Sequence, residues 1–497
     1  MASRPAPPTP DVRDPGQKRH EPRGIYAARL ALVCLAYFGL AKAGLAFAFE
    51  NQSITAVWPP TGLALAAVVV WGYRMWPGIA LGAFLANLTT AGSTPTDLGI
   101  AAGNTLEALA GAYLLTNVAR FHPSLDRVRD VLALVGYAAI LSTTISATIG
   151  VASLAASGLV DGGQIGSAWR VWWLGDAGGD LIVAPALLIL AARPRLESRP
   201  GVWAEGVGLS VLLVGVSVTV FATGLGVAYV VFPLLFWIGL RYRQVGVVIA
   251  GLVTSGIAVG FTAHGEGPFI GGSIDTELLR SQTFVAVATI TGLLIAALTA
   301  ERRRTEDELR HRAEHDALTG LFNRARFTQE LEHQASYNAR YGGLGAVLVV
   351  DVDRFKRVND ALGHAAGDEL IARMSRLLRE CLRDTDVLGR WGGDEFTVLL
   401  PQASEAEAIA VVERLLAKVR REASIVRGEA AIPVTVSIGV TPFGPGIDLE
   451  PDAIMRSADA AMYQAKLTGR DRFERSELGW RRAGPESGPG PRRRAQA

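Results

Sequence analysis

Long apolar runs separated by short polar breaks fill the chain from about residue 25 to residue 300. A spanning helix needs roughly 17 to 20 apolar residues, so we expect an N-terminal, polytopic, all-α membrane domain with about eight to ten transmembrane helices. Several runs are close to the minimum length, so neighbouring runs can merge or re-enter, and eight spans are the alternative to ten. The ten candidate spans are 27–48, 55–72, 75–91, 101–119, 131–156, 171–192, 203–222, 226–240, 244–263 and 281–300.

Basic and acidic residues alternate between successive breaks. If the basic N-terminal arm lies inside the cell, the inner loops of a ten-span arrangement carry arginines such as Arg74, Arg241 and Arg302. The outer loops then carry acidic residues such as Glu50 and Asp161. This is the positive-inside pattern, and it predicts that the N-terminus and all residues after 300 are cytoplasmic.

The segments outside the membrane domain differ from it in their pattern of apolar and polar residues. After residue 316, amphipathic helical segments alternate with strand-like runs such as 344–353, which indicates a soluble α/β domain. A charged helical stretch without a long Gly/Ser linker precedes it, which favours mechanical coupling, although a plain spacer helix is the alternative. The expected domains are a disordered cytoplasmic arm (1–24), a membrane sensor domain (25–300), a signalling linker helix (301–315), an α/β domain (316–474) and a disordered tail (475–497).

Composition excludes some classes of protein. The net charge of +2 gives no reason to expect a nucleic-acid binder. The two cysteines, Cys34 and Cys381, lie far apart and make no disulfide framework, so we interpret them as small buried residues.

The first chemical signal is Asp351-Val352-Asp353, at the end of an apolar strand. Carboxylates at a strand end are well placed to hold a divalent metal through hard oxygen ligands, with the Val352 carbonyl between them. An Asp-x-Asp pair after a strand is also a common helix cap.

The second signal is Gly392-Gly393-Asp394-Glu395, a tight turn between two strand-like runs. Two glycines make a hairpin turn and let backbone N–H groups approach a phosphate closely. The two carboxylates suit metal binding or deprotonation of a hydroxyl group, while a purely structural turn is the alternative.

Taken together, the motifs resemble the GGDEF family of diguanylate cyclases over residues 305–474. The segments that carry the resemblance are DALTGLFNR (316–324), DVDRFKRVND (351–360), GHAAGD (363–368), GRWGGDEF (389–396), VSIGV (436–440) and ADAAMYQAKLTGR (458–470). The resemblance implies a nucleotidyl-cyclase or ferredoxin-like palm, with a mostly antiparallel sheet flanked by helices. It also implies a nucleotidyltransferase that condenses two GTP into cyclic di-GMP and two pyrophosphates as a homodimer formed through GGDEF domains and linker helix.

The resemblance also implies roles for individual residues. Asp351, the Val352 carbonyl and Asp394 look like the ligands of two Mg²⁺ or Mn²⁺ ions per active site. Asp394, Glu395 and Lys356 are the expected catalytic residues, and Asn359 and Asp368 look like the guanine readers. The expected phosphate contacts are Arg354, Phe355, Lys466, Arg470, Gly392 and Gly393.

A third motif, Arg383-x-x-Asp386, ends shortly before the glycine turn. It matches the family's inhibitory site for the product cyclic di-GMP. A guanidinium suits such a site because it can donate two parallel hydrogen bonds to guanine or phosphate. Arg414 is the expected supporting arginine. A surface Arg-x-x-Asp without this context is usually structural.

The membrane half resembles the first described type of membrane-associated sensor domain, often fused to GGDEF domains. The resemblance rests on Trp58-Pro59-Pro60-Thr61-Gly62 and on residues 172–185. Asp176 and Asp180 lie at membrane depth, as do Lys42, Asn104 and Glu107, and ionisable groups there indicate function; mutual pairing or snorkelling is the alternative.

We therefore expect an active, product-inhibited diguanylate cyclase in a bacterial-type inner membrane, regulated by its sensor domain. The first alternative is a non-catalytic cyclic di-GMP receptor, and the second is a transporter with a regulatory GGDEF domain.

Overall fold

The computed structural model describes residues 22–46, 57–89, 93–193, 200–224, 226–272, 274–427, 430–445 and 450–477. The chain divides into two compact units, one up to Arg304 and the other from Thr305 onward. Most of the predicted N-terminal arm and C-terminal tail lies outside the described residues, and the domain boundaries expected from the sequence stay predictions.

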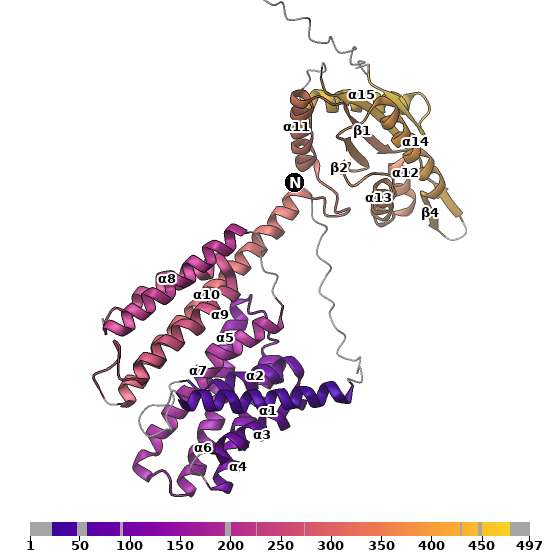
Figure 1. Cartoon of the computed structure of the whole chain (residues 1–497). Coiled ribbons are helices and arrows are strands. Elements are labelled where there is room, and N and C mark those ends of the chain that lie inside the picture. Colours follow the sequence, from indigo (N-terminus) through magenta and orange to yellow (C-terminus); the bar gives the residue numbers. More distant parts are fainter. Residues whose placement is uncertain are drawn as a thin grey trace, which may run out of the picture. The chain divides into compact units, whose positions relative to one another are not determined.

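The N-terminal unit is built from helices, as predicted (Figure 1). They are α1 (Arg23–Ala46), α2 (Pro59–Trp71), α3 (Trp76–Leu88), α4 (Thr94–Tyr113), α5 (Val128–Ala133), α6 (Thr143–Ala156), α7 (Ile165–Ala191), α8 (Pro200–Thr223), α9 (Phe232–Ala263) and α10 (Ile274–Glu314). A π-helical segment, Leu134–Ser142, joins α5 to α6, so that these elements form one long rod.

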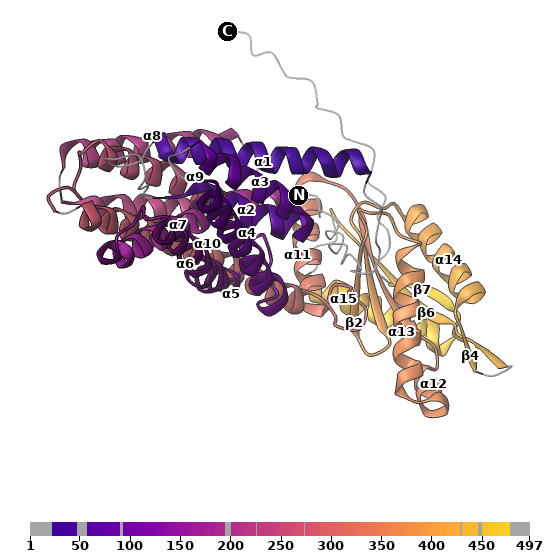
Figure 2. The same ribbon diagram turned by 90° about the horizontal axis from the view of Figure 1, so that it is seen from below.

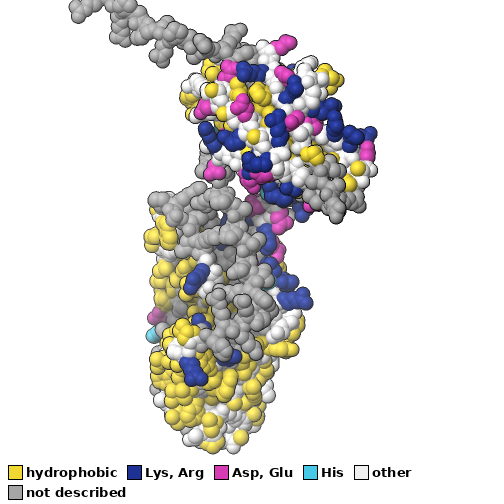
Figure 3. Space-filling view, turned by 90° about the vertical axis from the view of Figure 1, so that its right-hand side faces the viewer, with side chains coloured by type: hydrophobic (Ala, Val, Ile, Leu, Met, Phe, Trp, Pro, Cys, Tyr) yellow, Lys and Arg dark blue, Asp and Glu magenta, His cyan; other side chains and the backbone are white. Residues whose placement is uncertain are grey.

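The helical unit has the surface of a membrane protein. In the described residues, seven helices are long and apolar enough to cross a membrane. Large apolar side chains point outward, with Leu35 70% exposed and Leu190 72% exposed. Figure 3 shows hydrophobic side chains gathered over this unit, whereas Lys, Arg, Asp and Glu are scattered over the α/β unit. The protein is therefore a multi-pass membrane protein.

Helix α9, which begins at Phe232, contains the predicted span 244–263 and most of the predicted span 226–240. Arg243, between them, has a non-helical backbone with φ 57° and ψ −150°. A Cβ added at Gly239 would lie 3.1 Å from Cγ2 of Val247, although positions eight apart in a straight helix are about 12 Å apart. The chain therefore folds back at Arg243, which keeps the two predicted spans as separate segments.

The C-terminal unit alternates helices and strands, as Figure 2 shows from below. Its elements are α11 (Arg324–Tyr341), β1 (Gly345–Val352), α12 (Phe355–Leu362), α13 (His364–Arg379), β2 (Val387–Gly392), β3 (Glu395–Leu400), α14 (Glu405–Glu422), β4 (Ser424–Arg427), β5 (Ala430–Pro433), β6 (Val436–Phe443), α15 (Pro451–Leu467) and β7 (Arg472–Arg475). The main sheet has the order β2-β3-β1-β6-β7, and β4 and β5 form a separate ribbon. Only β6 and β7 pair in parallel within the main sheet, so the predicted mostly antiparallel α/β fold is confirmed.

The central strand β1 explains why both faces of the sheet are covered. All eight of its residues are buried, and successive side chains point to opposite faces. Leu348 and Val350 belong to the core that includes residues of α13 and α14. Val347 and Val349 belong to a second core with residues of α11 and α15. By this alternation, Asp351 points to the face covered by α11 and α15.

Candidate active site

The site begins where β1 ends. Asp351 is 5% exposed and pairs across the sheet with Glu395 on β3 and Ser437 on β6. The Nζ atom of Lys466, in the last turn of α15, lies 2.7 Å from Oδ2 of Asp351. The fold thus brings together a strand-end carboxylate and a lysine from more than 100 positions later in the chain.

The hairpin between β2 and β3 brings the second carboxylate to the same place. The backbone N–H of Val352 donates to the carbonyl of Asp394 over 3.2 Å. Gly393 has a φ of 50°, a conformation that favours glycine. The turn therefore fixes Asp394 and Glu395, from one sequence motif, beside Asp351 and Val352, from another.

Burial dominates the electrostatics of these carboxyl groups. It raises the pKa of Asp351 to about 6; the Lys466 ammonium opposes this shift, and the charge of Asp394 adds to it. Burial also raises the pKa of Glu395, with a further contribution from the nearby charge of Asp459. Several carboxylates close together, with one ammonium among them, form a site that favours added positive charge.

Asp353 has a different role from Asp351, although it is two residues away. Its two carboxylate oxygens accept hydrogen bonds from the hydroxyls of Thr435 and Ser437, each over 2.7 Å. The backbone N–H of Asp471 also donates to it. Asp353 is therefore engaged in holding β1 to β6 and to the segment before β7, and only Asp351 of the pair faces the hairpin.

Helix α12 begins directly beyond this strand end. Arg354 occupies its N-cap with a left-handed backbone (φ 57°, ψ 27°), and Phe355 is the first helical residue. The first N–H groups of a helix have no partner inside it, so those of Phe355 and Lys356 are available to a phosphate. The Lys356 side chain is exposed.

Asn359 and Asp368 lie on the two consecutive helices α12 and α13, which pack together. The Oδ1 atom of Asn359 is buried without a hydrogen-bond partner among the described residues. A Cβ added at Gly367 would collide with that oxygen and lie 3.1 Å from Cζ of Phe355, so a larger residue there would displace the Asn359 side chain. Asp368, the next residue, is exposed. The pair thus offers one unsatisfied amide oxygen and one exposed carboxylate.

Arg470 is less close to the carboxylates than Lys466. It follows α15 with a φ of 63°, and its Nε atom lies 4.0 Å from Oδ1 of Asp353 rather than beside Asp351. Its guanidinium is half exposed.

The Arg383–Asp386 motif forms a turn between α13 and β2. The N–H of Arg383 donates to Oδ2 of Asp386 over 2.9 Å, and the N–H of Asp386 donates to the carbonyl of Arg383 over 3.0 Å. The Arg383 guanidinium is 66% exposed and lies 3.9 Å from Glu407. Arg414 donates twice to the Cys381 carbonyl, so its guanidinium is engaged in fixing this loop to α14.

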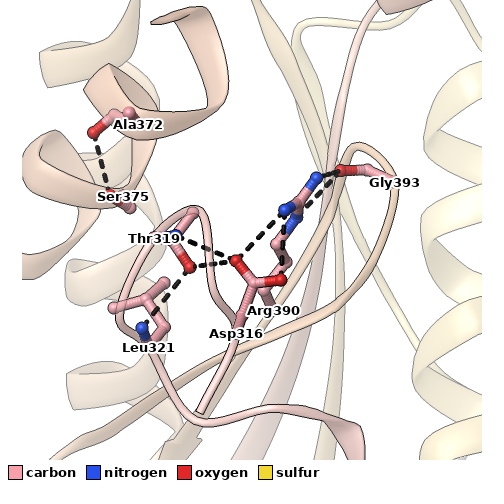
Figure 4. A network of polar contacts seen from close by, with 7 residues as sticks. All are labelled: Asp316, Thr319, Leu321, Ala372, Ser375, Arg390 and Gly393. Carbon is pink, nitrogen blue, oxygen red and sulfur yellow. Dashed lines mark hydrogen bonds and ion pairs between the residues drawn. The ribbon is translucent and has the colours of Figure 1, made fainter. Parts of the chain in front are cut away.

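Sequence reasoning assigned no role to Arg390, which supports the hairpin (Figure 4). Its guanidinium donates to the Gly393 carbonyl and, over 3.1 Å, to both oxygens of Asp316. Asp316 also accepts from the N–H and hydroxyl of Thr319. Burial opposes ionisation of Asp316, but the bonds from Thr319 and Arg390 outweigh it and lower its pKa. The position of Arg390, two residues before Gly392, was the sequence feature that could have indicated this supporting role.

The site fits a metal that is shared with a substrate. The described residues contain no group of three or more His, Cys, Asp or Glu side chains arranged to hold a metal ion. Mg²⁺ is usually bound by one or two carboxylates together with substrate phosphates. The buried carboxylate of Asp351 beside Asp394 meets that requirement.

Family models match both units of the chain. The model named MASE1 matches residues 29–303, which is more than half of the chain, and the model "Diguanylate cyclase, GGDEF domain" matches residues 313–472.

Curated relatives match less than half of the chain. Diguanylate cyclase DgcM of Escherichia coli K12 is 35% identical over 203 residues, which cover 40% of this chain and 48% of that protein. Diguanylate cyclase TpbB of Pseudomonas aeruginosa is 37% identical over 189 residues, or 37% of this chain and 43% of that protein. The chain therefore spans about half the length of these relatives.

Among solved structures, the GGDEF domain of TpbB from Pseudomonas aeruginosa is 37% identical, with a TM-score of 0.31, and the match covers 33% of this chain and 95% of that one. The coiled coil and GGDEF domain of DgcB from Caulobacter crescentus, solved with c-di-GMP, is 27% identical with a TM-score of 0.34 and covers 36% and 94%. On the match of the family models, the chain belongs to the MASE1 family of membrane proteins and carries a C-terminal GGDEF domain.

Proposed function

We propose that the protein is a membrane-bound diguanylate cyclase that condenses two GTP molecules into cyclic di-GMP and releases two pyrophosphates. The observation that carries this proposal is the meeting of Asp351, Val352, Asp394 and Lys466 at the end of β1. Carboxylates, a lysine and a glycine turn are the groups that phosphoryl chemistry uses. The named relatives, which are diguanylate cyclases, support the same assignment.

In this proposal each residue has a separate task. Asp351, the Val352 carbonyl and Asp394 hold two Mg²⁺ or Mn²⁺ ions, which neutralise triphosphate charge and lower the pKa of the attacking 3′-hydroxyl group when bound. Lys466 and Arg470 provide positive charge for the phosphates, and Gly392, Gly393 and the N–H groups at the start of α12 let them approach. Glu395 keeps the carboxylate geometry, and Lys356 lies at the α12 end of the site.

Guanine recognition falls to Asn359 and Asp368. The unsatisfied Oδ1 of Asn359 needs a donor, and an exposed carboxylate can accept from the guanine N1 and N2 groups. A site built to hydrogen-bond these groups rejects a base that lacks them. We therefore propose GTP, and not ATP, as the substrate.

Because one GGDEF domain holds one GTP, the reaction requires two domains facing each other in a homodimer. Helix α10 supports regulation by the membrane unit, since it runs without interruption from Ile274 to Glu314. At its exit from the bundle, Glu301 accepts from the N–H of Val128 and Arg303 donates to the Leu240 carbonyl. We place the N-terminus and the GGDEF domain in the cytoplasm, on the positive-inside pattern.

The test uses the full chain purified into lipid nanodiscs and incubated with Mg²⁺ and either GTP or ATP, with products separated by chromatography. We expect cyclic di-GMP and pyrophosphate from GTP alone. Binding of cyclic di-GMP by a folded, dimeric protein that makes none would favour a non-catalytic receptor.

Product inhibition is proposed to act through Arg383 and Asp386, whose turn leaves the Arg383 guanidinium exposed. Arg383→Ala should raise the cyclic di-GMP concentration for half-inhibition about tenfold or more, because charged hydrogen bonds contribute about 1.5–3 kcal/mol. The control is Arg379→Ala, which removes another exposed arginine nearby. Equal inhibition of both variants would contradict the assignment.

A further inference from the structure

Three carboxyl groups lie inside the helical bundle, far in sequence from the proposed active site. Glu107 on α4 and Asp176 and Asp180 on α7 are each 1% exposed. Asp176 and Asp180 are four residues apart and therefore share one face of α7. Asn104, three residues before Glu107 on the same face of α4, shares the Ser146 hydroxyl with Asp176. The three carboxyl groups are here called the buried acidic cluster.

Hydroxyl groups from other helices hold Asp176. Thr61 of α2 donates to Oδ1 over 2.9 Å, and the Ser146 hydroxyl of α6 lies 2.8 Å from Oδ2. The same Ser146 oxygen lies 2.8 Å from Oδ1 of Asn104 and accepts from the indole N–H of Trp172. Asn104 in turn donates to the Tyr37 hydroxyl of α1.

Counting hydrogens shows that this network is short of donors. The single hydroxyl hydrogen of Ser146 faces two acceptors, on Asn104 and on Asp176. Both oxygens of Glu107 and both oxygens of Asp180 are buried without any hydrogen-bond partner in the described part of the chain. Unpaired buried acceptors are costly, and unpaired buried charges cost much more. The cluster therefore needs additional positive charge or additional hydrogens.

The surroundings leave the proton as the simplest ligand. No basic side chain of the described bundle donates to Glu107 or Asp180. The titratable groups that face the cluster are its own carboxyls and Tyr37 of α1; α2 and α6 contribute the hydroxyls of Thr61 and Ser146. The described residues include no metal-binding group of three or more side chains. A proton both neutralises a carboxylate and converts an acceptor into a donor.

We propose that the buried acidic cluster is a proton-binding site in the membrane unit. A proton held between Glu107 and Asp176 supplies a donor to the network, and a second proton neutralises Asp180. Helix α7, which carries Asp176 and Asp180, also packs against the helix that leads out of the bundle. Ala177 and Leu181 of α7 pack in one cluster with Ala286 and Ile290 of α10, so a change in proton occupancy has a direct packing route to α10.

The test uses the full chain in nanodiscs and three variants, Glu107→Gln, Asp180→Asn and the control Asp161→Asn. Asp161 is an exposed carboxylate of the same unit. Infrared spectroscopy at neutral pH detects the carbonyl stretch of protonated carboxyl groups. We expect the wild type and Asp161→Asn to show the band of buried protonated carboxyls, and Glu107→Gln and Asp180→Asn each to lose part of it. The same band in all four proteins, or none in the wild type, would overturn the proposal.

Thermal unfolding gives an independent readout. A carboxyl group that stays neutral in the folded state makes the protein less stable as the pH rises, because the same group ionises in the unfolded chain. The unfolding constant then increases by up to about tenfold per pH unit. We expect Tm to fall less steeply with pH in Glu107→Gln and Asp180→Asn than in the wild type and Asp161→Asn. A second comparison measures Tm in Na⁺ or Mg²⁺ salt and in choline salt at equal pH and ionic strength. If Na⁺ or Mg²⁺ gives the higher Tm in the wild type but not in the two cluster variants, the ligand is an inorganic cation and the proton assignment is wrong.

Discussion

The chain contains two clusters of carboxyl groups with opposite surroundings. In the GGDEF domain, Asp351 is buried but has the Lys466 ammonium at 2.7 Å, and the neighbouring Gly392 and Gly393 are exposed. In the membrane unit, Glu107 and Asp180 are buried with unpartnered oxygens. The first cluster, made of Asp351, Asp394 and Glu395, is here called the open cluster, because it adjoins the exposed glycine turn at which we propose that GTP binds. The second, the buried acidic cluster, is here called the closed cluster. Carboxylates thus take their role from the counter-charge and access that the fold gives them.

The largest effect is expected from Asp394→Ala, which removes a proposed metal-binding carboxylate from the open cluster. Synthesis of cyclic di-GMP should fall at least about a hundredfold, because electrostatic groups at a reacting centre contribute on that scale. The assay is pyrophosphate release from GTP with Mg²⁺. Asp452→Ala, at an exposed carboxylate in the first turn of α15, is the control and should keep its rate. Retained synthesis in Asp394→Ala would remove Asp394 from the site.

Lys466→Met tests the counter-charge that distinguishes the open cluster. It leaves Asp351 beside Asp394 and Glu395 without an ammonium and removes a phosphate contact, so kcat/KM for GTP should fall about tenfold or more. Lys418→Met is the matched control, since Lys418 pairs with the exposed Glu380 at 2.6 Å. Lys418 belongs to α14, which covers the face of the sheet opposite to α15. Equal rates for both variants would show that the open cluster does not depend on its lysine.

Ser146→Ala tests the closed cluster, whose carboxylate Asp176 depends on hydroxyl donors. Loss of the hydroxyl removes the one hydrogen that Asn104 and Asp176 share and the acceptor of the Trp172 indole N–H, so the membrane unit should lose about 1–3 kcal/mol of stability. The measurement is thermal unfolding of the full chain in nanodiscs. Ser153→Ala, on the same helix, loses only a bond to its own helix at Ile149 and should change stability by less than about 0.5 kcal/mol.

The smallest effect is expected from Asp316→Asn, which weakens the support of the hairpin rather than the cluster itself. The pKa of Asp316 is lowered in the fold, so its carboxylate stabilises the native state at neutral pH, and this contribution is lost as pH falls through the acidic range. The variant should therefore be less stable than the wild type by about 1–2 kcal/mol at neutral pH. The difference in stability should vanish in acid. A difference that stays constant with pH would mean that the ionised carboxylate of Asp316 does not provide the stabilisation.

Much of the site could be predicted because its motifs are short and local. The turn at Gly392–Gly393, the strand ending in Asp351 and the helix starting after Arg354 all follow from a few neighbouring residues. Arg390 was missed because its partner Asp316 lies 74 positions earlier. The different role of Asp353 was also hidden, since Thr435, just before β6, and Ser437, within it, lie more than 80 positions away.

The sequence by itself determined the two-part plan of the protein, because apolar runs long enough to span a membrane and alternating α/β segments are properties of local composition and periodicity. It also supplied the motifs from which we propose the residues of the active site. Only the tertiary structure decided that Asp351 meets Lys466 and that Asp353 accepts from hydroxyls instead. It also decided that Glu107, Asp176 and Asp180 are enclosed in the helical bundle. The reason is physical: the behaviour of a charged group depends on the partners and the water around it, and distant segments supply both.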